Sequence, residues 1–104
     1  MAAGAGDAGL TGRVLIADDS VPRLAPHVRL RYDEARSRWA VLAPERMLLP
    51  DDIAVEVLQR LDGQRTLAAI IDLLAQEFQA ERAEVRGDVI DLLQDLSDKG
   101  FVTA

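Results

Sequence analysis

The residues able to perform acid–base or nucleophilic chemistry are few in this chain. It has no cysteine and a single histidine, His27. Proton transfer or an activated nucleophile needs a partner group within hydrogen-bond reach of the reacting group. No such constellation surrounds His27, which falls at the start of a predicted strand on its polar face. We therefore predict that the chain is not an enzyme.

Metal and cofactor sites are equally hard to place. Zinc and calcium sites need histidine, cysteine or carboxylate ligands at set spacings. The sequence holds no pair of histidines and no calcium-loop spacing. Gly4 and Gly6 follow no strand and lack the lysine of a phosphate loop. The sequence predicts no metal and no cofactor.

Carboxylates at helical spacing form the densest charged pattern. Residues 83–98 are predicted to be a helix in which acids recur every three or four residues and so share one stripe. The stripe is either a solvated face or a docking surface for a basic partner. The candidate docking residues are Asp88, Asp91, Asp95 and Asp98.

The same helix has an apolar flank beside its buried side. Ile90 and Leu93 widen the apolar stripe beyond a single core line. If the helix lies beside a strand at residues 47–49, these side chains wall a groove along a sheet edge, which suits strand addition by a peptide. The alternative is that Ile90 and Leu93 pack against Phe101 and the first helix.

Alternation of apolar and polar residues predicts a three-stranded antiparallel sheet ahead of the helices. The predicted strands span residues 27–33, 39–42 and 47–49. Tyr32 faces Trp39 across the first turn, and we expect at least one of these rings to be in the core. The third strand stops at Pro50, which cannot donate to a ladder.

Three helices follow the strands. Asp51 or Asp52 can cap the first and Thr66 the second, because their oxygens accept amide hydrogens of the opening turn. Gly63 and Gly100 are placed to end the first and third helices. The order of elements indicates an α+β, winged helix-turn-helix-like fold. The residues predicted to face the core are Ile53, Val57, Leu61, Leu67, Ile70, Ile71, Leu74, Phe78, Val85, Val89, Leu92, Leu96, Phe101 and Val102.

Length and charge set further limits. A chain of 104 residues has room for one domain. Residues 1–21, rich in glycine and alanine, are predicted to be a flexible tail or linker, and residues 22–104 to be the folded domain. A net charge of −6 counts against nucleic acid or anionic membrane as a partner. No signal peptide or apolar span is legible, so we expect a cytoplasmic protein.

The charge is distributed unevenly along the chain. Residues 21–40 carry a net charge of +3, whereas residues 41–104 carry −7. This asymmetry suggests two docking surfaces of opposite sign. A winged-helix DNA-binding regulator would need a basic recognition helix, and the acidic third helix counts against it. A purely structural subunit is a further alternative.

An ordered set of motifs extends over residues 22–104. The motifs are Leu42-Ala43-Pro44-Glu45, Leu48-Leu49, Asp62-Gly63-Gln64-Arg65-Thr66, Asp88-Val89-Ile90-Asp91-Leu92-Leu93-Gln94-Asp95-Leu96 and Lys99-Gly100-Phe101-Val102. In this order they resemble the PqqD family, the peptide chaperones of pyrroloquinoline quinone (PQQ) biosynthesis. The chain departs from the family pattern at Arg46, where glycine is frequent, and at Pro50, where asparagine is frequent.

The resemblance implies a peptide-binding recognition element without catalytic activity of its own. It would bind the ribosomally made precursor peptide PqqA by strand addition and present it to the radical S-adenosylmethionine (SAM) enzyme PqqE. Fusion to or association with the oxidase PqqC is a further implied partnership. Leader recognition in another peptide-modification pathway is the alternative. The implied peptide contacts are Met47, Leu48, Leu49, Arg86, Ile90 and Leu93.

Overall fold

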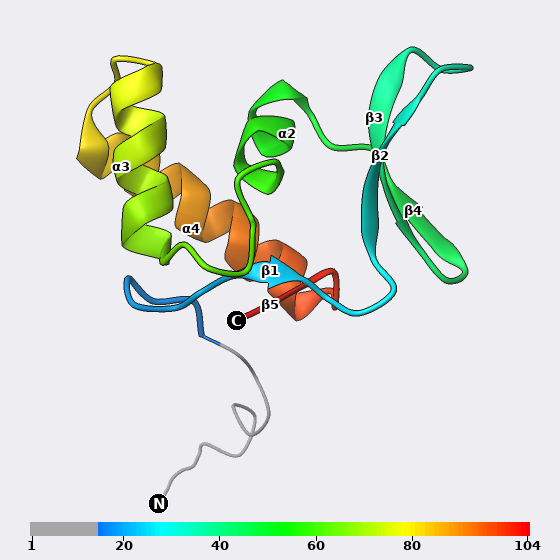
Figure 1. Cartoon of the computed structure of the whole chain (residues 1–104), viewed down its shortest axis with the longest axis horizontal. Helices are drawn as coiled ribbons and strands as arrows, with labels where there is room; N and C mark the ends of the chain where they lie inside the picture. The colour runs from blue at the N-terminus through cyan, green and yellow to red at the C-terminus, as the bar shows by residue number, and fades with distance from the viewer. Residues whose placement is uncertain (1–14) are drawn as a thin grey trace, which may run out of the picture.

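The order of strands and helices follows the predicted α+β pattern in a computed structural model that describes residues 15–104. Its elements are β1 (Arg23–Leu24), β2 (Arg29–Asp33), β3 (Arg38–Ala43), β4 (Arg46–Leu48), α2 (Asp52–Leu58), α3 (Leu67–Glu77), α4 (Arg82–Asp98) and β5 (Val102–Thr103). In Figure 1, α2 lies between α3 and the sheet formed by β2, β3 and β4. The predicted three-stranded antiparallel sheet followed by three helices is confirmed.

The sheet has the order β2-β3-β4, so β3 is central and β4 is an edge strand. Tyr32 of β2 is paired with Trp39 of β3. Their ring centroids are 5.6 Å apart in an edge-to-face arrangement, which is favourable for aromatic rings. Trp39 is half-buried and Tyr32 is exposed. The pair packs on itself at the sheet surface, and the prediction that one ring lies in the core is wrong.

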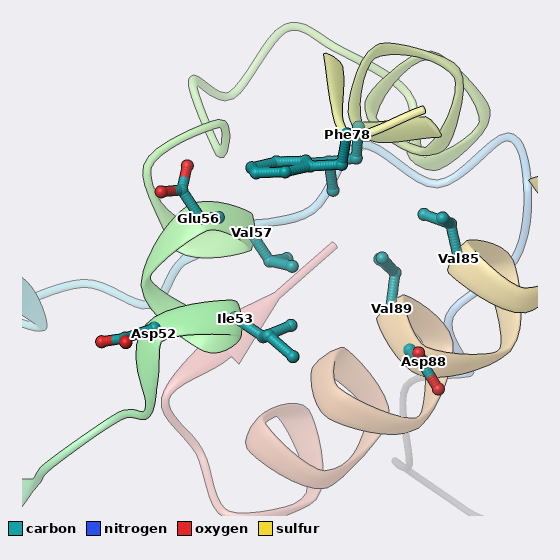
Figure 2. Close-up of a pocket in the computed structure, with 9 residues that line it drawn as sticks. Asp52, Ile53, Glu56, Val57, Phe78, Val85, Asp88 and Val89 are labelled. Carbon is teal, nitrogen blue, oxygen red and sulfur yellow. The ribbon is translucent and has the colours of Figure 1, made fainter. Parts of the chain in front are cut away.

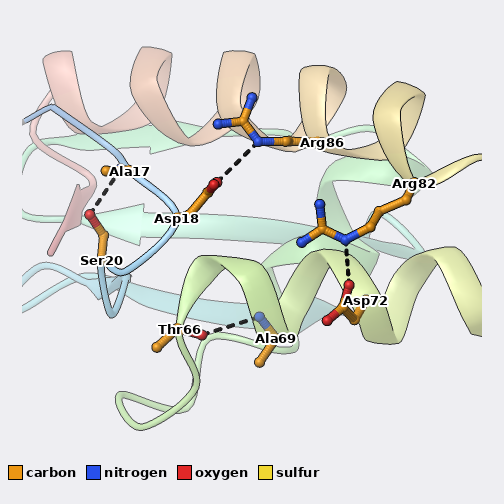
Figure 3. Close-up of polar contacts among 8 residues, drawn as sticks. All are labelled: Ala17, Asp18, Ser20, Thr66, Ala69, Asp72, Arg82 and Arg86. Atoms are coloured by element: carbon orange, nitrogen blue, oxygen red, sulfur yellow. Dashed lines mark hydrogen bonds and ion pairs between the residues drawn. The ribbon is translucent and has the colours of Figure 1, made fainter.

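Side-chain caps begin the first two helices at the predicted residues. Asp51 Oδ1 accepts from the Ala54 amide at 2.8 Å, and Thr66 Oγ1 accepts from the Ala69 amide at 3.2 Å (Figure 3). Helix α2 ends at Leu58, earlier than predicted. Leu61 therefore lies in the loop that follows α2, where it is half-buried against the core.

One hydrophobic core joins the helices to the central strand. Val41 of β3 is fully buried, and it belongs to the same cluster as residues of α2, α3 and α4. Phe101 and Val102 fold back into this cluster, as predicted. Ile53 and Phe78, by contrast, are 68% and 55% exposed, so their predicted place in the core is wrong. Among the described helices, none combines the length and apolar character needed to cross a bilayer.

Residues 15–21 pack against the helices instead of forming a tail. Ile16 is buried in the core cluster. The carbonyl oxygens of Asp18 and Ser20 accept from the amides of Ala68 and Leu67, at 3.0 and 2.8 Å. The first amides of any helix have no hydrogen-bond partner within the helix, and these two carbonyls act as partners for the first amides of α3. The packed part of the chain thus includes residues before the predicted boundary at 22, and the predicted tail at residues 1–14 lies outside the described residues.

Candidate functional site

The outer edge of β4 is the surface best suited to receiving another strand. Among residues 15–104, β4 has one strand neighbour, β3, so its other side presents backbone amide and carbonyl groups as a free edge. Met47 and Leu49 are 45% and 39% exposed, whereas Leu48 between them packs on the core. Apolar side chains that alternate along a free edge suit an incoming extended peptide.

The predicted helix residues of this site lie in three different environments. Leu93 is fully buried in the core cluster, and Ile90 is half-buried against it. Arg86 is exposed, and its Nε donates to Asp18 Oδ1 at 3.0 Å (Figure 3). The structure therefore brings Arg86 to the N-terminal segment at residues 15–20 and Leu93 to the core. It leaves Met47 on the outer part of the sheet.

Arg46 connects the start of β4 to the end of α4. Its Nη1 donates to the backbone oxygen of Lys99 at 2.6 Å. The guanidinium also lies over the Phe101 ring, 4.3 Å from the centroid, which is a cation–π contact. A long cationic side chain at this position therefore ties the edge strand to the end of the helix.

The acidic stripe of α4 is exposed along its length, as its spacing predicts. Asp95 forms an ion pair with Lys99 at 2.9 Å. Asp98 accepts from Gln94 Nε2 at 3.0 Å. Asp88, near the other end of the helix, lines an apolar groove. The stripe therefore runs along α4 from the groove, which Asp88 lines, to the end of the helix, where Arg46 contacts Lys99.

The groove lies between α2, α3 and α4 and has a volume of about 380 Å³ (Figure 2). Ile53 of α2 and Phe78 at the end of α3 extend over its opening. The sequence pattern predicts both residues in the core, because each falls on an apolar line of its helix. One feature of the sequence could have indicated that Ile53 is exposed: α2 has more apolar residues than its buried face can hold. Ala54, Val57 and Leu58 occupy that face, and Ile53 lies outside it.

A cluster of charges lies beside the groove. Arg60 contacts Glu56 at 2.9 Å and also pairs with Glu77, which connects α2 to the end of α3. Burial lowers the pKa of Arg60, but its hydrogen bonds to Glu77 and Glu56 outweigh that effect, so the pKa lies above its ordinary value. This cluster is structural, since its cation is already shared between two carboxylates.

No group of three or more His, Cys, Asp or Glu side chains in residues 15–104 is placed to hold a metal ion. His27 lies in the turn before β2 with a φ of 68°, and not within the strand as predicted. The described surface presents three contact areas: a sheet edge, a groove and an acidic helix face.

Comparison with known proteins gives consistent matches. A family model described as "Coenzyme PQQ synthesis protein D (PqqD)" matches residues 38–102. A PqqA binding protein of Rhodopseudomonas palustris (strain HaA2) is 58% identical over 90 residues, covering 86% of this chain and 88% of that protein. A PqqA binding protein of Xanthomonas campestris pv. campestris (strain B100) is 49% identical over 84 residues, covering 81% and 91%.

A solved structure is similar in fold over the same region. It is the solution structure of the PqqD truncation of Methylobacterium extorquens PqqCD, with a TM-score of 0.74 and 38% identity. The match covers 86% of this chain and 95% of that one. That protein is described as a functional, stand-alone recognition element for ribosomally synthesized and post-translationally modified peptides (RiPPs).

Proposed function

Since this chain belongs to the PqqD family, we propose that it is a peptide chaperone that binds PqqA and presents it to the enzyme that modifies it. Relatives that are 58% identical over 90 residues and 49% identical over 84 residues are named PqqA binding proteins. The similar Methylobacterium domain is a recognition element that stands alone. In this proposal the chain contributes recognition and has no catalytic activity of its own.

The observation that carries the proposal is the free edge of β4. Strand addition satisfies the backbone groups of an edge and gives affinity, while side-chain pockets fix the register. Met47 and Leu49 are exposed there, and Leu48 anchors the strand to the core. PqqA would therefore pair with residues 47–49, with apolar side chains seated on Met47 and Leu49.

The helix residues contribute in unequal ways. Leu93 is inside the core, so its part is to hold α4 in place behind the site. Ile90 retains some exposed surface. Arg86 is shared with Asp18, so a peptide carboxylate would have to compete with that pair to reach it. We therefore propose Met47, Leu48 and Leu49 as the main contacts, with Ile90 and Arg86 at the margin.

The same proposal includes the downstream partners. The exposed acids Asp88, Asp91, Asp95 and Asp98 offer PqqE a surface separate from β4. An association with PqqC is consistent with the PqqCD origin of the similar Methylobacterium domain. Because PqqA is made on ribosomes, we place this action in the cytoplasm.

The proposal can be tested by titrating the isotope-labelled full chain with synthetic PqqA and following amide chemical shifts. We expect saturable shifts concentrated at residues 46–49. Met47→Asp should weaken binding about tenfold, because a charge replaces an apolar contact. Ile53→Asp, which adds the same charge at another exposed apolar residue, should bind PqqA as the wild type does.

Two results would contradict the proposal. One is the absence of saturable shifts on the sheet. The other is an equal loss of affinity in the Met47 and Ile53 variants, since a general effect of charge would then explain both. A leader peptide from another pathway serves as comparator, and tighter binding of that peptide would favour the alternative role.

A further inference from the structure

Two of the most exposed large apolar side chains in the described structure lie at the same opening. Ile53 is 68% exposed and Phe78 is 55% exposed. They come from α2 and from the end of α3, and both extend toward the space above α4 (Figure 2). Single exposed apolar residues are common, but a pair at one cavity marks a contact surface.

The space beneath them has an apolar floor. Val57, Leu74 and Val89, one from each helix, are buried at its base, and Val85 lines its side. A volume of about 380 Å³ falls within the ~300–1,000 Å³ typical of sites that take apolar side chains or small ligands. The groove can therefore receive apolar side chains without rearrangement of the core.

Every polar residue that lines the groove is acidic: Asp52, Glu56 and Asp88. Glu56 is paired with Arg60. For Asp52 and Asp88 the structure records no ion pair with any residue from 15 to 104. An apolar floor inside a negative rim favours apolar groups that arrive together with positive charge.

We propose that this groove docks an amphipathic segment of a partner protein, in which apolar side chains are flanked by lysine or arginine. The apolar side chains would insert between Ile53 and Phe78, and the cations would meet Asp88 on the α4 side of the opening (Figure 2). The site is separate from the β4 edge, so the inference does not depend on strand addition. Nucleic acids and anionic lipids are disfavoured because both would bring negative charge to a negative rim.

The test uses the isotope-labelled full chain and a synthetic amphipathic helix of leucine and lysine as the probe. We expect saturable amide shifts at Ile53, Phe78 and Val89. Ile53→Ser and Phe78→Ser should each weaken binding about tenfold, because each removes an apolar contact. Both side chains are exposed in the folded chain, and circular dichroism of the variants checks that they remain folded.

A matched pair of charge variants tests the rim independently of the apolar residues. Asp88→Asn should weaken binding about two- to fivefold, as expected for the loss of one exposed ion pair. Glu84→Gln removes an exposed acid from the same helix outside the groove and should leave affinity unchanged. Added salt should weaken binding to the wild type more than to Asp88→Asn.

Four results would overturn the inference. The first two are equal binding of a probe with glutamate in place of lysine and equal effects of the Asp88 and Glu84 variants. The third is a set of shifts confined to β4. The fourth is a concentration-dependent shift at Ile53 without a probe, which would assign the groove to a second copy. PqqA binding measured on the same variants separates the two sites. Ile53→Ser should leave it intact, and Met47→Asp should leave probe binding intact.

Discussion

At the scale of single residues, arginine side chains connect parts of the chain that are distant in sequence. Arg60 links α2 to the end of α3, and Arg46 links β4 to the end of α4. Arg82 pairs with Asp72 between α4 and α3 (Figure 3). A guanidinium is suited to this because it offers several donors in one plane. Arg60 is the least exposed of these and has the most to lose on substitution.

We predict that Arg60→Met lowers the free energy of unfolding by about 1–3 kcal/mol, because hydrogen bonds to two carboxylates are lost. Urea denaturation measures the change. Arg65→Met is the control, since Arg65 is exposed and lies 3.8 Å from its partner Asp62. Its expected effect is below about 0.5 kcal/mol. Equal effects of the two substitutions would show that the Arg60 contacts do not stabilise the fold.

Asp62 gives a prediction of pH dependence. Backbone hydrogen bonds from Arg65 and Gln64 hold the pKa of Asp62 below its ordinary value. The carboxylate therefore contributes stability that is complete above the ordinary pKa near 4 and is lost as the pH falls through the lower folded pKa. A carbon-detected NMR titration of the side chain should give a midpoint below the ordinary value.

The matched variants for this prediction are Asp62→Ala and Asp62→Asn. The difference in unfolding midpoint between wild type and Asp62→Ala should be greatest at neutral pH and should shrink in acid. Asp62→Asn keeps an acceptor oxygen but does not titrate, so the difference between Asp62→Asn and Asp62→Ala should not change with pH. A constant difference between wild type and Asp62→Ala would contradict the assignment.

At the scale of elements, the helices are short and depend on caps and on their neighbours. Helix α2 has seven residues and α3 has eleven. Isolated helices of this length are marginal in water, so tertiary packing supplies most of their stability. The caps at Asp51 and Thr66 fix where each helix starts, and hence which side chains face the core.

We predict that Thr66→Ala destabilises the protein by about 1 kcal/mol, because the cap on α3 is lost. Thr66→Ser keeps the hydroxyl and should restore most of the loss. Thermal unfolding followed by circular dichroism makes the comparison. If alanine and serine had the same effect, the methyl group of Thr66 and not its cap would be the stabilising feature.

Local patterns predict most of the elements but not all of the surface. The alternation of apolar and polar residues predicts the strands, and the capping residues predict where the helices start, because both signals depend on a few neighbouring residues. Whether Ile53 and Phe78 are buried depends on how α2 and α3 pack against α4, which the sequence does not state. The two-residue ladder of β1 and β5 is too short to leave a periodic signal.

In the predicted peptide site, too, neighbouring residues predict the strand, whereas contacts between distant residues cannot be predicted. Pro50 after the third strand and the apolar run before it marked residues 47–49 as an edge strand, and β4 is at the edge. The pairing of Arg86 with Asp18 joins residues far apart in sequence, so no spacing rule could predict it. Arg46 is a similar case, since its partners follow α4.

At the scale of the whole molecule, the segment at residues 15–20 joins α3 to α4. Ile16 donates its amide to Gln94 Oε1 at 3.0 Å and inserts its side chain into the core. The Asp18 carboxylate contacts Arg86 of α4 (Figure 3). The Asp18 backbone carbonyl accepts from the Ala68 amide in the first turn of α3. The segment thus packs across α3 and α4 on the side of α4 that carries Arg86.

We predict that Ile16→Ala lowers the free energy of unfolding by about 2 kcal/mol, because it leaves a cavity in the core. The neighbouring Leu15 is 61% exposed, and Leu15→Ala should change stability by less than about 0.5 kcal/mol. Urea denaturation of the two variants gives the contrast. Similar values for both would place Ile16 outside the cooperative core.

The edge-to-face pair of Tyr32 and Trp39 provides the protein with an optical reporter. Trp39 is the only tryptophan in the chain, and it lies on the strand next to β4. Its fluorescence therefore reports on the sheet, while the helix groove contains no indole. A strand added to β4 should alter the emission, whereas a segment docked between the helices should leave it unchanged. Unlabelled protein can thus distinguish the two binding events in one cuvette.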